Sequence, residues 1–228
     1  MDLGPYIALA VLTLGIGAAD YFWPNRRKRV NRGLAARPRA LVHDAQGTVR
    51  LTGRIRRTGE LLQAPLSGRP CVAYELVVDA PPRMSGPGMD ARPRLVEVGE
   101  ARPFLVADES GEARVDTSGP FLMSLSHDLT GDTDGCKYPD EHRALASFLL
   151  SLDVVPTNWL GRWRRFHYAE GVLEEGELVA VSAESVLEVD AMGERAGPRS
   201  QPQRLVLRGT EAVPLLISDR SDAGTLDS

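Results

Sequence analysis

A cysteine nucleophile activated by a histidine is the first chemistry that the side chains of this chain allow. Cys71 is the candidate nucleophile. The possible bases are the four histidines of the chain, His43, His127, His142 and His167. A reactive cysteine needs neighbours that hold it as a thiolate. Cys71 instead begins an apolar run, where a buried and inert thiol is the commoner outcome. We therefore expect Cys71 to pack, and keep a Cys-dependent enzyme as an alternative.

Two carboxylates, Glu75 and Glu170, stand inside apolar, strand-like runs. Acids in such positions either pair with arginines or transfer protons. Pairing that locks the fold is the simpler interpretation, and we adopt it here. Ser67 lacks the G-x-S-x-G setting of a hydrolase nucleophile, and the chain carries no H-E-x-x-H or phosphate-loop motif. The acids are therefore predicted to be structural.

Metal binding has one weak candidate. The polar loop from Ser126 to Pro139 holds His127, Cys136 and three aspartates, but it lacks the spacing of a calcium loop and its closing glutamate. A zinc RING finger needs about eight Cys and His ligands in paired spacings. The chain has 2 cysteines and 4 histidines, with no C-x-x-C. No metal, cofactor or small-molecule substrate is expected.

The segment from Leu62 to Val78 carries Cys71 and Glu75 and must position their side chains. A turn between Pro65 and Pro70 leads into a strand with period-2 alternation. The alternation predicts a half-buried strand. Its apolar face would carry Val72, Tyr74, Leu76 and Val78, and its other face Cys71, Ala73, Glu75 and Val77.

The remaining patterns favour a mainly β domain. Alternation predicts strands over Thr48–Arg56, Arg94–Val98, Pro103–Ala107, Ala113–Asp116, Trp163–Leu173, Glu177–Val189, Leu205–Arg208 and Leu215–Ile217. One amphipathic helix is predicted over Pro139–Asp153, packed on the sheet. Residues 41–217 are thus expected to form a small barrel-like domain, for which an OB-like barrel is one candidate arrangement, and residues 218–228 a flexible tail.

The N-terminal residues predict a membrane anchor. Pro5 to Trp23 is an apolar run whose one charge is Asp20, long enough as a helix to span the hydrocarbon core. A basic linker over residues 24–40 follows, beginning with the flank Arg26, Arg27, Lys28 and Arg29. By the positive-inside rule, this flank places the soluble domain in the cytoplasm, beside the inner cell membrane, with lipid as a contact. A cleaved signal peptide is the alternative, disfavoured because the charges follow the apolar run.

The charge of the soluble part disfavours nucleic acid. The whole chain has a formal net charge of -4. From Leu41 onward there are 20 basic and 29 acidic residues, a balance of -9. Binding to nucleic acid depends on neutralising phosphates. An OB-like nucleic-acid binder is therefore only a second alternative.

Three stretches resemble the GIDE domain, also called BAM, of the membrane-anchored ubiquitin ligases of the MULAN family and of bacterial relatives. The matching positions are Pro65, Gly68, Cys71 and Tyr74, then Phe104, Asp108 and Gly111, then Tyr168, Glu170 and Gly176. The resemblance covers about Val49 to Val189. It departs at Ser182-Ala183, where the family tends to have glycine.

The resemblance implies a module beside a membrane and does not imply catalysis. Ligase activity in that family belongs to a separate RING finger, for which this chain lacks the ligands. We expect a bacterial, single-pass, non-catalytic interaction or scaffolding module with an unidentified protein partner. An E3 ubiquitin ligase-like transferase is kept as an alternative.

Overall fold

The computed structural model describes residues 26–81, 92–133, 142–189 and 203–220. The predicted anchor, residues 5–23, lies outside these ranges. Within them, none of the helices has the length and apolar character needed to cross a membrane. The described chain is mainly β, with two α-helices.

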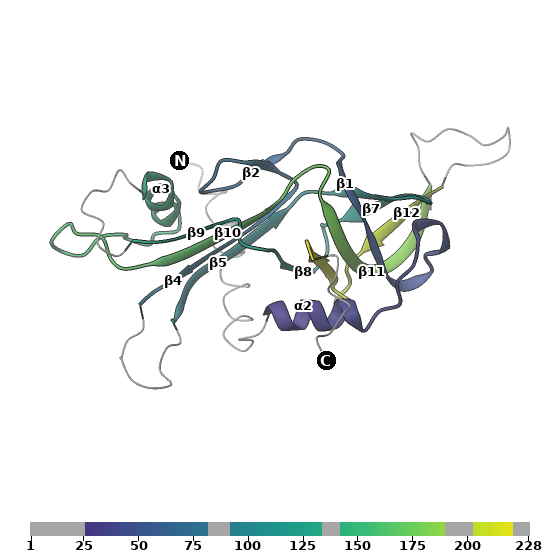
Figure 1. Cartoon of the computed structure of the whole chain (residues 1–228), viewed down its shortest axis with the longest axis horizontal. Coiled ribbons are helices and arrows are strands. Elements are labelled where there is room, and N and C mark those ends of the chain that lie inside the picture. Colours follow the sequence, from purple (N-terminus) through teal and green to yellow (C-terminus); the bar gives the residue numbers. More distant parts are fainter. Residues whose placement is uncertain (1–25, 82–91, 134–141, 190–202, 221–228) are drawn as a thin grey trace, which may run out of the picture.

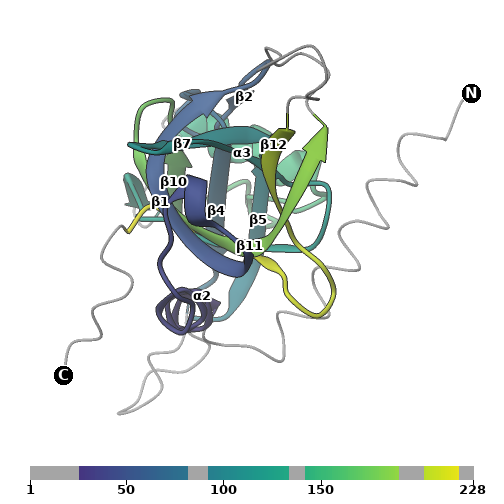
Figure 2. The ribbon, with the colours of Figure 1, turned by 90° about the vertical axis from the view of Figure 1, so that its right-hand side faces the viewer.

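A closed five-strand barrel forms one end of the molecule, where β11 pairs back onto β1 (Figures 1 and 2). In their order around the barrel, the strands are β1 (Gly47–Arg57), β6 (Phe104–Asp108), β7 (Gly111–Asp116), β12 (Gln203–Arg208) and β11 (Leu178–Val189). All pairings are antiparallel except that of β7 with β12. Alternate side chains of β1, such as Leu51 and Ile55, point into the barrel core.

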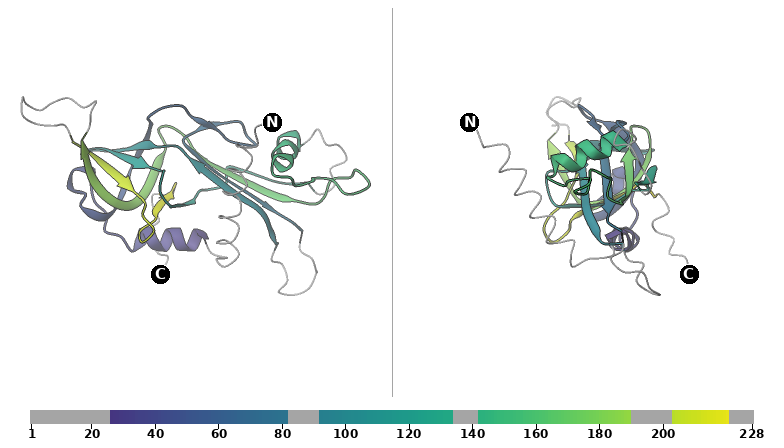
Figure 3. Two further views of the ribbon diagram at one scale, coloured as in Figure 1. Left: turned by 180° about the vertical axis from the view of Figure 1, so that it is seen from behind. Right: turned by 90° about the vertical axis from the view of Figure 1, so that its left-hand side faces the viewer.

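A second sheet extends away from the barrel (Figures 1 and 3). Its strands, in order, are β5 (Arg94–Ala101), β4 (Ala73–Asp79), β10 (His167–Leu173) and β9 (Leu129–Asp132). Strands β4 and β5 are inserted between barrel strands β1 and β6, whereas β9 and β10 are inserted between β7 and β11. Two separate insertions therefore build one sheet.

Three shorter pieces complete the described fold. A two-stranded ladder joins β2 (Leu62–Gln63) to β3 (Pro70–Cys71). β13 (Leu215–Ser218) pairs with β11, and β8 (Phe121–Ser124) pairs with β13. The 3-10 turn η1 (Val42–Asp44) lies beside the β6–β7 turn.

The predicted amphipathic helix is confirmed as α3 (Arg143–Ser151). Leu145 and Leu149 are buried against Leu76 and Val78 of β4, so the helix covers one face of the second sheet (Figure 1). The first residues of the prediction, 139–141, lie outside the described chain.

The segment predicted as a basic linker contains a docked helix, α2 (Arg26–Ala35). Val30 and Leu34 are both fully buried, and they pack against Ala180 of β11 and Leu216 of β13. The helix was not predicted, because only two apolar residues, at i and i+4, face the barrel and the rest of the segment is rich in arginine.

The strand at the centre of the prediction is buried on both faces, which corrects the half-buried interpretation. Glu75 and Val77, assigned to the open face, are each 6% exposed, whereas Tyr74 is only half-buried. α2 lies on the side of β4 that was expected to be open, since its Arg26 reaches Glu75.

Three further strand predictions need correction. β10 begins at His167 and not at Trp163. The polar loop expected from Ser126 contains β9, which extends the second sheet, and β8 was not predicted. β10 and β11 follow each other closely in sequence but belong to different sheets.

Candidate functional site

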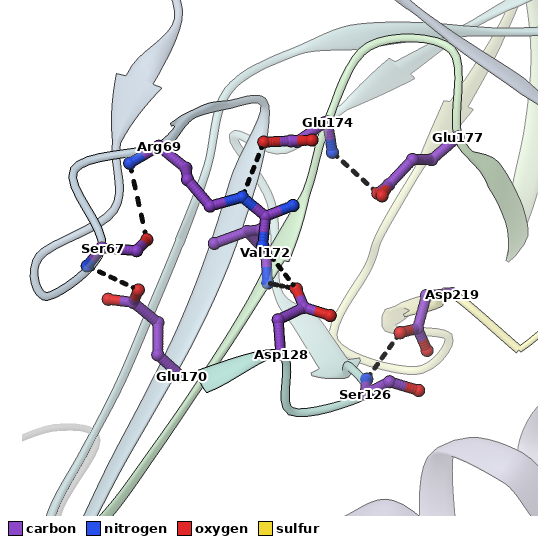
Figure 4. A network of polar contacts seen from close by, with 9 residues as sticks. All are labelled: Ser67, Arg69, Ser126, Asp128, Glu170, Val172, Glu174, Glu177 and Asp219. Carbon is purple, nitrogen blue, oxygen red and sulfur yellow. Dashed lines mark hydrogen bonds and ion pairs between the residues drawn. The ribbon is translucent and has the colours of Figure 1, made fainter. Parts of the chain in front are cut away.

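The turn that opens the central segment is held by a buried carboxylate. Glu170 of β10 is 1% exposed. One of its oxygens accepts a hydrogen bond from the backbone N–H of Leu66 (2.7 Å). The other accepts one from the backbone N–H of Ser67 (2.9 Å) (Figure 4). Gly68 closes the turn in the left-handed region, with φ 66° and a bond from its N–H to the carbonyl of Ala64. Glu170 therefore joins the turn to the second sheet. Within the described ranges its partners are these backbone amides and not the arginine that was predicted.

Arg69 connects the same turn to two more acids. Its Nε donates to Glu174 Oε1 at 2.9 Å, and its Nη1 lies 3.2 Å from Asp128 Oδ2 (Figure 4). Asp128 Oδ2 also accepts from the backbone N–H of Val172. The hydrogen bond with Glu174 raises the pKa of Arg69 above its usual value and lowers that of Glu174. This ion pair lies at the surface, and sequence reasoning missed it because the partners are 105 residues apart.

Cys71 is buried, as its apolar setting predicted. Burial raises the pKa of its thiol to about 11, and the charges of Glu170 and Glu174 act in the same direction. It packs in a cluster with Leu62, Ala64 and Val172. A thiol with this pKa stays protonated at neutral pH, so it has neither the access nor the charge of a nucleophile.

Tyr74 is half-buried against the same cluster. Its hydroxyl donates to Glu100 Oε2 at 3.2 Å. Burial, and then the negative charge of Glu100, raise its pKa to about 12. The hydroxyl of Tyr74 therefore reaches the surface of the domain, where it contacts an acidic side chain.

The other predicted acid, Glu75, does pair with an arginine. Arg26 Nη1 lies 3.5 Å from Glu75 Oε1 and donates to Glu97 Oε1 at 2.8 Å. The second oxygen of Glu75 accepts from the backbone N–H of Leu125. Burial raises the pKa of Glu75, and Arg26 and the Leu125 N–H partly oppose that rise. The membrane-flank residue Arg26 is thus part of the contact between α2 and the second sheet, whereas Arg27, Lys28 and Arg29 are exposed.

The β6–β7 turn is shaped by Asp108. Its carboxylate accepts bonds from the backbone N–H groups of Ser110 (2.7 Å) and Gly111 (3.1 Å), and from the N–H of Val42 in η1 (2.9 Å). Partial burial opposes ionisation, but these bonds and the Ser110 hydroxyl hold the pKa of Asp108 below its usual value. Phe104, at the start of this hairpin, is fully buried in the barrel core.

A pocket of about 340 Å³ opens at this end of the barrel. η1, the β6–β7 turn, β11 and β12 contribute its walls. The lining includes Val42, His43, Gly111, Glu112, Leu187 and Arg204. Leu187 is 64% exposed and lies opposite Leu205 in the β11–β12 ladder. The pocket therefore combines an apolar wall with groups of both charges. Apart from His43, named as a possible base, and Gly111, its residues were not singled out in the sequence.

The remaining predicted residues lie in strands and turns, where their contacts support the fold. Tyr168 of β10 contacts the ring of His142 edge-on. Gly176 adopts φ 88° in the turn between β10 and β11. Pro65 lies in the turn held by Glu170. These residues do not converge with Cys71 on one chemical centre.

The described residues contain no group of three or more His, Cys, Asp or Glu side chains placed to hold a metal. Asp132, from the candidate calcium loop, pairs with Arg92 (3.4 Å) and contacts His167 Nδ1 (3.3 Å). Residues 134–141, including Cys136, lie outside the described chain.

Comparison with known proteins yields no match to any family model, to any curated protein or to any solved structure. The resemblance to the GIDE domain therefore stays a prediction from the motif residues.

Proposed function

We propose that this chain is a membrane-anchored, non-catalytic interaction module of the GIDE type, which holds a partner protein beside the membrane. The observation that carries the proposal is the pocket at the barrel end, with the exposed Leu187 on its wall. Exposed apolar side chains that lie together beside polar groups are typical of a protein-binding surface. Val189, which lies on the same face of the strand as Leu187, is 61% exposed.

The docking of α2 supports the anchored arrangement. The predicted span ends at Trp23, and α2 begins at Arg26. Its first residue is tied to Glu75 and Glu97, and its apolar residues are buried on the barrel. An anchor that continues into this helix would carry the domain in a defined orientation, with lipid contacts made by the exposed Arg27 and Lys28.

Two further observations support a non-catalytic role in the cytoplasm. Burial of Cys71 and its raised pKa remove the cysteine–histidine pair on which a Cys-dependent enzyme would rely. The exposed basic residues after the predicted span favour a cytoplasmic domain. The barrel is further proposed to be OB-like, since it closes with five strands, but the balance of -9 from Leu41 onward disfavours nucleic acid as its ligand.

The anchored topology is tested with a reporter fused after Ser228 in living cells. We expect cytoplasmic reporter activity, and a mixed orientation when Arg26, Arg27, Lys28 and Arg29 are replaced by neutral residues. A periplasmic signal from the unmodified chain would overturn the anchored, cytoplasmic arrangement.

The interaction itself is tested by photo-crosslinking from a single position of the same full-length chain. A crosslinking residue at Leu187 should capture a discrete partner protein, whereas one at Thr130, exposed on β9 in the other sheet, should not. Deleting residues 5–23 should reduce capture. Equal capture from both positions would mean that the pocket is not the binding surface.

A further inference from the structure

The connection between α3 and β10 ends in a rigid turn that presents a tryptophan to solvent. Trp159 is 91% exposed and Leu160 is 55% exposed. Four of the ten large apolar side chains exposed in the described ranges fall between residues 150 and 160, with Leu150 and Val155 the other two. A side chain as large as tryptophan is seldom left in water at such a fraction.

The turn is built to hold these side chains outward. The backbone N–H of Asn158 donates to the carbonyl of Arg162 at 2.8 Å, and that of Gly161 donates to the carbonyl of Asn158 at 2.9 Å. The side-chain Oδ1 of Asn158 accepts from the N–H groups of Leu160 and Arg162. Gly161 has φ 70°, the conformation that glycine adopts most readily. Trp159 is therefore presented by an ordered backbone, and binding through it costs little conformational entropy.

The base of the turn is anchored in the fold. Thr157 and Trp163 form a β-bridge, and Trp163 packs with the cluster under α3. The ring of His142 meets Trp163 edge-on at 5.9 Å. The two tryptophans of this turn therefore differ: Trp163 is held in the fold and Trp159 points away from it.

The residues around the turn carry an excess of positive charge. From 142 to 166 the chain carries four arginines and one carboxylate, Asp153. Arg162 is the last residue of the turn and is exposed. The guanidinium carbon of Arg164 lies 5.8 Å from the centroid of the Phe166 ring. The apolar tip is therefore backed by arginines.

We propose that the Asn158–Arg162 turn is a membrane-contact tip, which inserts Trp159 and Leu160 into the interface of an anionic lipid surface. Tryptophan favours the lipid–water interface, and arginines beside it can reach the phosphates while their stems lie along apolar groups. The turn lies at the end of the molecule opposite the barrel, where its backbone projects outward (Figures 1 and 3). A projecting apolar tip with basic residues matches a lipid surface better than the pocket of a protein. The contact is additional to the predicted anchor and does not require it.

The test uses the full chain reconstituted in phosphatidylcholine vesicles, with and without phosphatidylglycerol, and with lipids brominated on their acyl chains. The fluorescence of Trp159 is obtained as the difference between the wild type and Trp159→Phe. Trp163→Phe, in the same turn, is the matched control. We expect bromine to quench the Trp159 signal strongly in phosphatidylglycerol vesicles, and the Trp163 signal weakly.

The arginines supply the second arm of the test. Arg162→Gln and Arg164→Gln should each lower the ratio of inserted to free turn about five-fold in the anionic vesicles, and much less in neutral ones. If Trp159 is quenched no more than Trp163, or equally in both lipids, the membrane-contact tip is wrong, and a protein becomes the occupant to seek. Extraction with alkaline carbonate tests the anchor separately, because an anchored chain resists extraction whether or not Trp159 is quenched.

Discussion

Replacing Glu170 by glutamine tests whether the turn of the central segment depends on one buried carboxylate. Glu170→Gln keeps the volume of the side chain but leaves a single acceptor oxygen. One of the two N–H groups, of Leu66 or of Ser67, must then face an amide NH₂. The variant therefore loses one charge-assisted hydrogen bond and weakens the other. It also places the amide NH₂, a donor, against a backbone N–H, which is a donor too.

The size of the effect follows from the same geometry. A hydrogen bond to a charged group contributes about 1.5–3 kcal/mol, and a neutral one about 1 kcal/mol. Ser67 is exposed and Leu66 half-buried, so water can satisfy part of the loss. We expect Glu170→Gln to lower the free energy of unfolding by about 2 kcal/mol. Glu174→Gln is the control: its side chain is 33% exposed and pairs with Arg69 at the surface, so it should cost about 0.5 kcal/mol.

Two measurements check the prediction. Urea titration of the full chain in a mild detergent gives the two changes in unfolding free energy. Hydrogen exchange of the peptide covering residues 64–69 gives the local effect, which should be faster exchange in Glu170→Gln alone. If Glu174→Gln were the more costly change, or if exchange in this peptide were unaltered, Glu170 would not be what holds the turn.

The remaining predictions concern Arg26 and Cys71. Arg26→Met should cost about 3 kcal/mol at neutral pH, because it leaves Glu75 buried without its cation. Since the pKa of Glu75 is already raised in the folded chain, stability falls as pH rises from about 4.3 through the folded pKa. Urea titration across pH should therefore show a steeper fall in Arg26→Met, which adding Glu75→Gln abolishes; an unchanged pH profile would rule out the coupling. Iodoacetamide should alkylate Cys71 more slowly in the native chain than in urea, and faster native labelling would favour an enzyme.

Local patterns in the sequence predicted an element well when only one of its faces packs against the core. The alternation of β1 and the helical spacing of Leu145 and Leu149 are such cases. The i, i+4 pair Val30 and Leu34 was the only apolar signal for α2, and the surrounding arginines outweighed it.

Local sequence patterns could not predict which strands pair or which side chains meet in the site. Nothing in the residues of β10 and β11 tells that they enter different sheets, because the partner of a strand is set by segments far along the chain. Glu170 was correctly singled out as an acid inside a strand, but its partners are amides 103 and 104 residues away. Leu187 and Arg204 meet at the pocket only because β11 and β12 pair in the folded barrel.

The origin of the second sheet in two separate insertions constrains how such a protein can fold and evolve. β4 and β10 form its central pair, and each comes from a different insertion. A chain with one insertion alone would expose the unpaired edge of a mostly buried strand, which is prone to aggregation. The two insertions therefore depend on each other. A chain that loses one insertion is at a disadvantage if it keeps the other. The same arrangement is expected to slow folding, because β4 and β10 pair residues that are 88 to 100 positions apart in the sequence.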